Sequence, residues 1–183
     1  MNEKYLEDFR TAYGRSFDGG VDWLRVFIKP YNRLLYFGRI YESAKNPIKR
    51  FVAKLFVDQA CRRLDSCMQF GNNLGGGVMF AHCHGITVPR DVKAKGHLCL
   101  FKGCTIGHVR SGNRHGWPQL GDRVVIGINA TVVGGIRIGN NVLIAPNAFV
   151  NFDVPDNSVV VGNPGVIHHC DDPCSVYLGQ EVA

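Results

Sequence analysis

A hydrophobic pattern with a period of six residues runs through the second half of the chain. Large aliphatic residues recur every six positions, and a second apolar column follows each of them by four positions. The first column is Leu120, Ile126, Val132, Ile138, Ile144 and Val150, and the second is Val124, Ala130, Ile136, Val142, Ala148 and Val154. A helix would repeat every three or four residues, and an ordinary strand every two. The period of six predicts a parallel β-solenoid, in which stacked coils bury a common core.

The same period continues upstream and is broken twice. The earlier columns are Val88, Ala94, Leu100 and Ile106, with Ile86, Val92, Leu98 and Cys104 as their partners. Fourteen residues separate Ile106 from Leu120, two more than a whole number of units, so a loop is predicted over residues 108–119. Near Phe80 two phases of the repeat collide, and the pattern does not say which way His82 points. Polar clusters that interrupt a regular element are candidate functional positions.

The N-terminal third has a helical period instead. Apolar residues at intervals of three and four predict helices over Pro47–Leu64, Tyr31–Ala44 and Trp23–Ile28. The predicted organisation is therefore a helical region (1–66), a β-helix (67–167) with its extruded loop, and a C-terminal tail (168–183). The tail carries His168, His169, Cys170 and Cys174, but no second pair at zinc-finger spacing, so no metal is expected.

Charge and cysteine content bear on the binding partners and the cellular location of the protein. The net charge is +6, and thirteen Lys/Arg against eight Asp/Glu precede Cys67. This basic half leaves open a peripheral membrane contact or a phosphorylated ligand, although nothing resembles a nucleic-acid-binding module. The seven cysteines lack C-x-x-C spacing and are expected to be reduced thiols packed as small hydrophobes. We expect a cytoplasmic protein, or one at the inner membrane surface.

Three stretches resemble the hexapeptide-repeat acyltransferases, and within them the serine-acetyltransferase-like group. They are Gly75–Val88 with its Ala-His-Cys-His-Gly-Ile segment, Gly112–Asp122 with an Arg-His pair, and Gly127–Gly165 with its Gly-Asn-Pro-Gly ending. The resemblance implies a left-handed parallel β-helix preceded by helices and assembled as a homotrimer. It also implies that acetyl-CoA, the acyl donor, lies in a groove between neighbouring β-helices.

The resemblance also assigns roles to individual residues. His82 matches the catalytic base, and His115 with Arg114 matches the loop pair that faces the acceptor. The groove for acetyl-CoA would be lined by Gly127, Ile128, Ala145 and Pro146. Acetyl transfer from a thioester to a hydroxyl needs a base for the hydroxyl proton and a donor that stabilises the oxyanion. A neutral histidine can supply the base near pH 7.

The chain departs from the serine enzymes at two acidic positions. Ala81 stands where the family has an Asp before the base, and Cys67 stands where it has an orienting carboxylate, although Asp65 is close. These acids would hold a charged amino acid. We therefore predict a sugar or polysaccharide hydroxyl as the acceptor, contacted by Asn113, Trp117 and Gln119, and keep L-serine as the alternative.

Two other classes of function stay open. A γ-type carbonic anhydrase uses the same β-helix with three zinc-binding histidines, and His82, His84, His108 and His115 are candidates for such ligands. A solenoid without catalysis would serve as an assembly scaffold. The Arg-His loop and the Gly-Asn-Pro ending favour acyl transfer.

Overall fold

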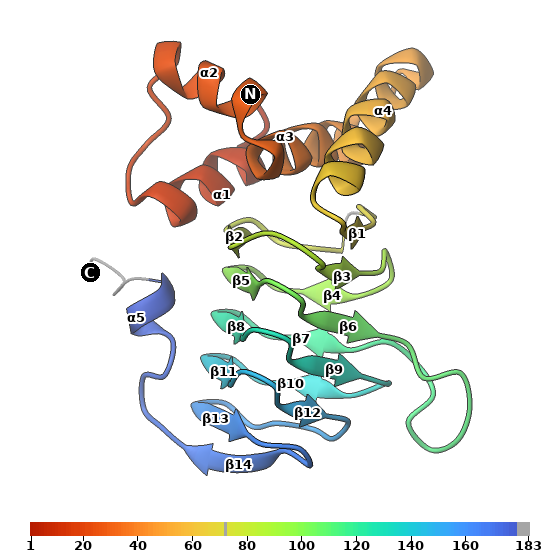
Figure 1. Cartoon of the computed structure of the whole chain (residues 1–183), viewed down its shortest axis with the longest axis vertical. Helices are drawn as coiled ribbons and strands as arrows, with labels where there is room; N and C mark the ends of the chain where they lie inside the picture. Colours follow the sequence, from red (N-terminus) through yellow and green to blue (C-terminus); the bar gives the residue numbers. More distant parts are fainter. Residues whose placement is uncertain (72, 179–183) are drawn as a thin grey trace.

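A helical head sits at one end of a three-sided β-helix (Figure 1). The computed structural model describes residues 1–71 and 73–178. The helices are α1 (Glu3–Tyr13), α2 (Gly20–Ile28), α3 (Pro30–Ser43), α4 (Pro47–Arg63) and the short α5 (Ser175–Leu178). The three helices predicted from the period of three to four residues are thus confirmed. None of these helices is long and apolar enough to cross a membrane.

Local signals explain where the long helices begin. Asn46 caps α4 by accepting hydrogen bonds from the backbone N–H groups of Ile48 and Lys49, and Pro47 occupies the first helical turn. Asn2 caps α1 in the same way through the N–H of Tyr5. Inside the head, Phe37 of α3 stacks on Phe56 of α4 with ring centroids 4.2 Å apart. The buried residues of the head are continuous with the core of the β-helix, in one hydrophobic cluster.

The strands within the described residues form three sheets that wrap around one core. One sheet holds β1 (Cys67–Met68), β3 (Thr87–Val88), β6 (Thr105–Gly107), β9 (Thr131–Val133) and β12 (Phe149–Val150). A second holds β4 (Lys93–Ala94), β7 (Gln119–Leu120) and β10 (Arg137–Ile138). The third holds β2 (Met79–Ala81), β5 (Leu98–Phe101), β8 (Val124–Ile126), β11 (Val142–Ile144), β13 (Ser158–Val161) and β14 (Val166–His169).

The register of the sheets explains the period of six. Val142 lies beside Val124 and Ile144 beside Ile126, so each regular coil contains eighteen residues, or three units of six. All twelve residues of the two predicted columns between Leu120 and Val154 are at most 4% exposed. The predicted parallel β-solenoid is confirmed.

The first break in the period is a two-residue insertion at a corner. Met68 pairs with Val88 and Phe80 with Leu100, which makes the first coil twenty residues long. The extra residues lie between β2 and β3, in the segment that contains His82, Cys83 and His84. The corner therefore bulges outward where the two phases of the sequence pattern collide.

The second break is a long excursion between β6 and β7. Ile106 and Leu120 occupy successive sheets, where equivalent positions elsewhere are six residues apart, so this turn holds eight extra residues. Figure 1 shows the segment projecting from the solenoid beside β6 and β9. An antiparallel bridge between Val109 and Gly116 closes its base.

The C-terminal segment folds back onto the solenoid. The predicted boundary after residue 167 falls inside β14, which runs antiparallel to β13. Beyond β14, the chain returns along the outside of the six-stranded sheet to α5 (Figure 1). Cys174 is fully buried there against Cys99 and Val125. The segment thus covers an apolar outer face.

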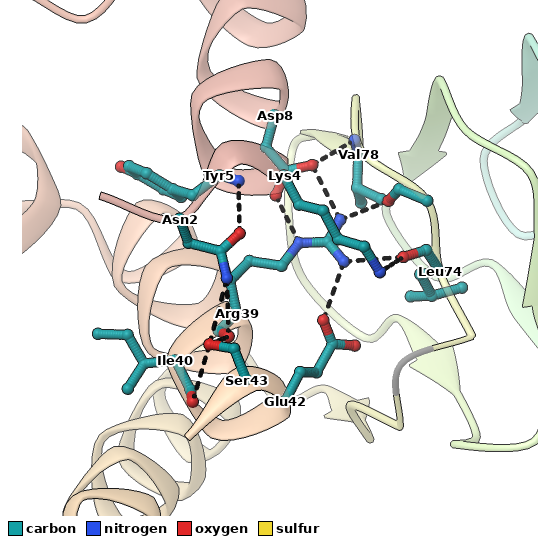
Figure 2. A network of polar contacts seen from close by, with 11 residues as sticks. Asn2, Lys4, Tyr5, Asp8, Arg39, Ile40, Glu42, Ser43, Leu74 and Val78 are labelled. Atoms are coloured by element: carbon teal, nitrogen blue, oxygen red, sulfur yellow. Dashed lines mark hydrogen bonds and ion pairs between the residues drawn. The ribbon is translucent and has the colours of Figure 1, made fainter. Parts of the chain in front are cut away.

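A buried polar cluster joins the head to the first coil (Figure 2). Arg39 of α3 donates two hydrogen bonds to the carboxylate of Asp8 in α1, at 2.8 and 2.9 Å. It also donates to the backbone oxygens of Leu74 and Gly75, and Asp8 accepts the N–H of Val78 at 2.8 Å. Both side chains are fully buried. This cluster fixes the position of the head on the β-helix.

Candidate active site

His82 lies at the outward bulge between β2 and β3. Its side chain is exposed, whereas the neighbouring Cys83 is buried. Its φ is +55°, in the left-handed region that residues other than glycine enter rarely. The same conformation occurs at Asn129 and Asn147 in the turns of later coils, so it belongs to the corners of this β-helix. The sequence pattern left the orientation of His82 open, and the structure points it outward.

A cavity of about 480 Å³ lies beside His82, between the bulge and the head. Its walls are Pro30 and Tyr31 at the start of α3, Arg63 and Leu64 at the end of α4, and Phe80, His82, Cys83 and His84 of the bulge. Burial raises the pKa of the Cys83 thiol to about 12, so this cysteine stays protonated near neutral pH. His82 and His84 supply two imidazoles to the described walls of this cavity, and histidine is the side chain that most often serves as a general base.

His82 begins a continuous edge of the solenoid, where the six-stranded sheet meets the five-stranded sheet. We call it the His82 edge; its segments are 82–86, 102–104, 127–130 and 145–148. Backbone hydrogen bonds connect successive coils here, from Gly103 N to His84 O at 2.8 Å, from Asn129 N to Lys102 O at 3.1 Å and from Asn147 N to Ile128 O at 2.8 Å. The predicted CoA residues therefore lie on the same edge as the predicted base.

The four predicted CoA residues differ in what they present to solvent. Gly127 is buried, and a Cβ there would lie 2.7 Å from the carbonyl oxygen of Ile144. Its lack of a side chain thus serves the packing of one coil on the next. Ile128 and Ala145 are half-buried, and Pro146 is exposed. Of the four predicted residues, these three therefore present surface to solvent.

The loop between β6 and β7 presents the predicted acceptor residues. Asn113, Arg114 and His115 are exposed, as is Gln119 at the start of β7, and the guanidinium of Arg114 lies 3.7 Å from the carboxylate of Asp153. Trp117 is half-buried against the core, and its ring stacks on His108 with centroids 4.4 Å apart. A hydrogen bond from Gly135 N to Arg114 O, at 2.8 Å, ties the loop to the next coil. The loop is therefore built on an internal aromatic contact.

Within one chain, the loop and His82 belong to different edges. The loop leaves where the five-stranded sheet meets the three-stranded sheet, whereas His82 lies where the five-stranded sheet meets the six-stranded one. The walls of the His82 cavity, as far as the described residues form them, include none of residues 108–119. The structure thus places His82 on the same edge as the predicted CoA residues, and leaves His115 and Arg114 on another edge.

The candidate zinc ligands are divided in the same way. His108 and His115 lie near each other, with ring centroids 5.3 Å apart, and His82 and His84 lie on the other edge. In residues 1–71 and 73–178, no three His, Cys, Asp or Glu side chains gather in a group that could hold a metal ion.

Comparisons with known proteins show which families this chain resembles. The family described as bacterial transferase hexapeptide (six repeats) matches residues 118–151. A serine acetyltransferase of Synechococcus elongatus is 37% identical over 97 residues, which cover 52% of this chain and 39% of that protein. The chain is similar to the serine acetyltransferases of the hexapeptide-repeat class.

Solved structures extend the similarity to the head. The serine acetyltransferase of Neisseria gonorrhoeae in complex with serine matches with a TM-score of 0.72 and 26% identity, over 91% of this chain and 68% of that one. A serine acetyltransferase in complex with CoA matches with a TM-score of 0.72 and 24% identity, over 91% and 68%. The predicted left-handed parallel β-helix with an N-terminal helical region is confirmed. In sequence, the chain spans about two fifths of the Synechococcus relative.

Two residues of the cavity were not predicted from the sequence. Arg63 ends α4 and Tyr31 begins α3, and only the packing of the head on the first coil places them beside His82. Asp65, considered as a substitute for the missing acids, lines a different cavity together with Cys67 and Ser66. The signal that could have found Arg63 is its position at the junction between the helical and six-residue periods.

Proposed function

We propose that the protein is an acetyl-CoA-dependent O-acetyltransferase in which His82 is the general base. The observation that carries this proposal is the placement of His82 at the exposed bulge, facing a cavity and at the start of the edge that holds the predicted CoA residues. The similarity to serine acetyltransferases supports the same chemistry.

The reaction requires two proton transfers, one from the acceptor hydroxyl to His82 and one from His82 to the CoA thiolate. His82 takes the proton of the acceptor hydroxyl while the hydroxyl oxygen attacks the thioester carbonyl carbon. The tetrahedral intermediate then collapses, the carbon–sulfur bond breaks and the acetyl ester forms. The protonated imidazole returns its proton to the CoA thiolate. An imidazole suits both steps because its ordinary pKa lies near physiological pH.

The acceptor best supported by the relatives is L-serine, since the similar proteins are named for it. This favours the alternative of the sequence analysis over the predicted sugar hydroxyl. The observation that keeps a sugar as a second candidate is local. Ala81 has no acidic group, and of the described residues that line the cavity none is Asp or Glu. The ammonium of serine would need a counter-charge from elsewhere.

We also propose that the active site is shared between copies of the chain in a homotrimer. His115 and Arg114 lie on a different edge from His82, so they can act on the same acceptor only if a neighbouring copy supplies them. The resemblance to hexapeptide-repeat acyltransferases supports this arrangement. Acetyl-CoA would then bind between the His82 edge of one copy and the loop of the next.

Replacing His82 tests the proposed chemistry. His82→Ala should lower the rate of acetyl transfer by about 10²–10⁴-fold, because a general base contributes about that much, and should leave acetyl-CoA binding nearly unchanged. The measurement is CoA release with a thiol reporter, alongside a calorimetric titration of acetyl-CoA. His168→Ala, at an exposed position on β14, is the control. Turnover near the wild-type rate in His82→Ala would remove His82 from the mechanism.

Co-expression tests the shared site. A His82→Ala chain and a His115→Ala chain, carrying different tags, should each form weakly active homotrimers. Mixed trimers purified through both tags should regain a fraction of wild-type activity, because one interface then combines an intact His82 with an intact loop. Mixed trimers that are no more active than the parent variants would contradict a site formed by two copies.

A further inference from the structure

Of the described residues that line the cavity beside His82, Arg63 is the one arginine, and none is Lys, Asp or Glu. We propose that Arg63 binds an anionic group of the acceptor, a carboxylate or a phosphate, and so positions the acceptor hydroxyl at His82. This inference rests on the proposed acetyl transfer and adds the class of substrate. Arg63 would contribute to binding of the acceptor, whereas His82 removes the proton of the acceptor hydroxyl.

The position of Arg63 fits such a role. It is the last residue of α4 and is exposed at the cavity wall. Among the residues that the structure describes, Arg63 has no hydrogen-bonding or ion-pair partner. Arg39 is paired with Asp8, and both Arg15 and Arg25 with Asp22, whereas Arg10 and Arg62 resemble Arg63 in having no such partner among the described residues. The guanidinium at the cavity is therefore available to a ligand.

The residues described around the cavity leave the charge of Arg63 uncompensated. Asp65 follows Arg63 by two residues but lines the separate cavity formed with Cys67 and Ser66. Tyr31, which also lines the cavity, stays neutral, because burial and the nearby Tyr13 hydroxyl raise its pKa to about 12. With no carboxylate on the described walls, an anionic group gains an attraction here that a cationic group does not.

Guanidinium chemistry favours planar or tetrahedral oxyanions. The fork of N–H donors on an arginine binds carboxylate or phosphate oxygens in pairs. L-serine offers a carboxylate, and a sugar phosphate offers a phosphate, so both acceptor candidates contain members that Arg63 would select. Free neutral sugars and serine derivatives without a carboxylate lack this contact.

Matched acceptors test the inference in the full-length wild-type protein. L-serine and N-acetyl-L-serine keep the carboxylate, whereas L-serinamide loses it; glucose 1-phosphate carries a phosphate that glucose lacks. We expect the anionic member of a pair to have a kcat/KM at least about tenfold higher, since a hydrogen bond to a charged group is worth about that factor. N-acetyl-L-serine separates the carboxylate from the ammonium. The serine pair and the glucose pair separate carboxylate from phosphate.

Arg63→Gln and Arg62→Gln form the matched pair of variants. Arg62 is the preceding residue, is also exposed and lines the Cys67 cavity instead. Arg63→Gln should raise KM for anionic acceptors by about ten- to a hundredfold, with a much smaller change in kcat and little effect on neutral acceptors. Arg62→Gln should behave as wild type. Equal losses on anionic and neutral acceptors, or no preference in the wild type, would overturn the inference.

Direct binding separates this inference from the proposed activity. Calorimetric titration of L-serine and of glucose 1-phosphate should show binding of at least one to the wild type and weaker binding to Arg63→Gln. Binding that depends on Arg63 without any acetyl transfer would overturn the proposed function and support the anion site. Acetyl transfer to neutral acceptors, with no anion binding, would overturn the anion site and support the proposed function.

Discussion

The β-helix and its junction with the helical head are stabilised in different ways. In the β-helix, each coil repeats the contacts of the one before it, and Val124 and Val142 or Ile126 and Ile144 are equivalent neighbours in register. At the junction nothing repeats. Asp8, Arg39 and the backbone of residues 74–78 form a single buried cluster (Figure 2).

This difference bears on function because the candidate site lies at the junction. A repeated core spreads its stability over many similar contacts, so losing one methyl group affects one coil. A buried ion pair is different, since removing one partner leaves an uncompensated charge in a low dielectric. The cavity beside His82 needs the head for two of its walls. The shape of the site therefore depends on the less redundant of the two regions.

Removing the guanidinium of Arg39 should have the largest effect on stability. Arg39→Ala leaves the buried carboxylate of Asp8 without its partner, and we expect a loss of about 3–5 kcal/mol in the free energy of unfolding. Trp23 lies in the head and Trp117 in the loop, so a Trp117→Phe background reports on the head by fluorescence. In urea, the Arg39→Ala head should unfold before the circular dichroism of the β-helix changes.

The solenoid control is Ile144→Val, which removes one methyl group from a fully buried position. It should lower the free energy of unfolding by about 0.5–1.5 kcal/mol. The fluorescence and circular dichroism transitions should still coincide. If the two transitions coincide in Arg39→Ala, and if its loss of unfolding free energy is no greater than that of Ile144→Val, then the junction is not the less stable region.

The sequence alone predicted most of the β-helix and little of the junction. The period of six identified the buried columns because each coil repeats the same inward positions, and its two breaks located the bulge and the loop. It left the direction of His82 open, since two extra residues at a corner do not determine which of them turns outward. The structure resolves this through the left-handed backbone of His82.

The cavity residues escaped prediction for a different reason. Arg63 and Tyr31 come from helix ends, and their meeting with His82 depends on how the head is placed on the first coil. That placement depends on Arg39 and Asp8, which are far apart in sequence and belong to no repeating pattern. The helical period predicted the helices themselves but carried no information on their docking.

The labelling rates of two buried cysteines offer a second comparison of the junction and the solenoid. Burial raises the pKa of both Cys83, at the junction, and Cys104, inside the solenoid, to about 12. Cys104 is fully buried, whereas Cys83 is 6% exposed and lines the cavity beside His82, so both access and opening set the labelling rate of Cys83. Cys83 should react with iodoacetamide about tenfold faster under native conditions, and the acceleration caused by a junction variant reports on opening.

Site-resolved mass spectrometry gives both labelling rates in one sample. Arg39→Ala should accelerate labelling of Cys83 far more than that of Cys104. Equal rates at the two cysteines, in both the wild type and the variant, would show that head and β-helix open as one cooperative unit.

The smallest effect is expected at the outer face of the head, and one helix offers a matched pair. Phe51 of α4 is 62% exposed, whereas Phe56 on the same helix stacks on Phe37. Phe51→Ser should change the free energy of unfolding by less than about 0.5 kcal/mol, as for other exposed positions. Phe56→Ser should cost several times more, because it removes a stacked ring and leaves a hydroxyl among aromatic side chains. Urea unfolding of both variants at two protein concentrations, with sedimentation at each, is the measurement. A concentration-dependent loss of unfolding free energy in Phe51→Ser alone would mean that a second copy of the chain covers this face in solution. The solvent exposure of Phe51 in the assembled protein would then be lower than in one chain.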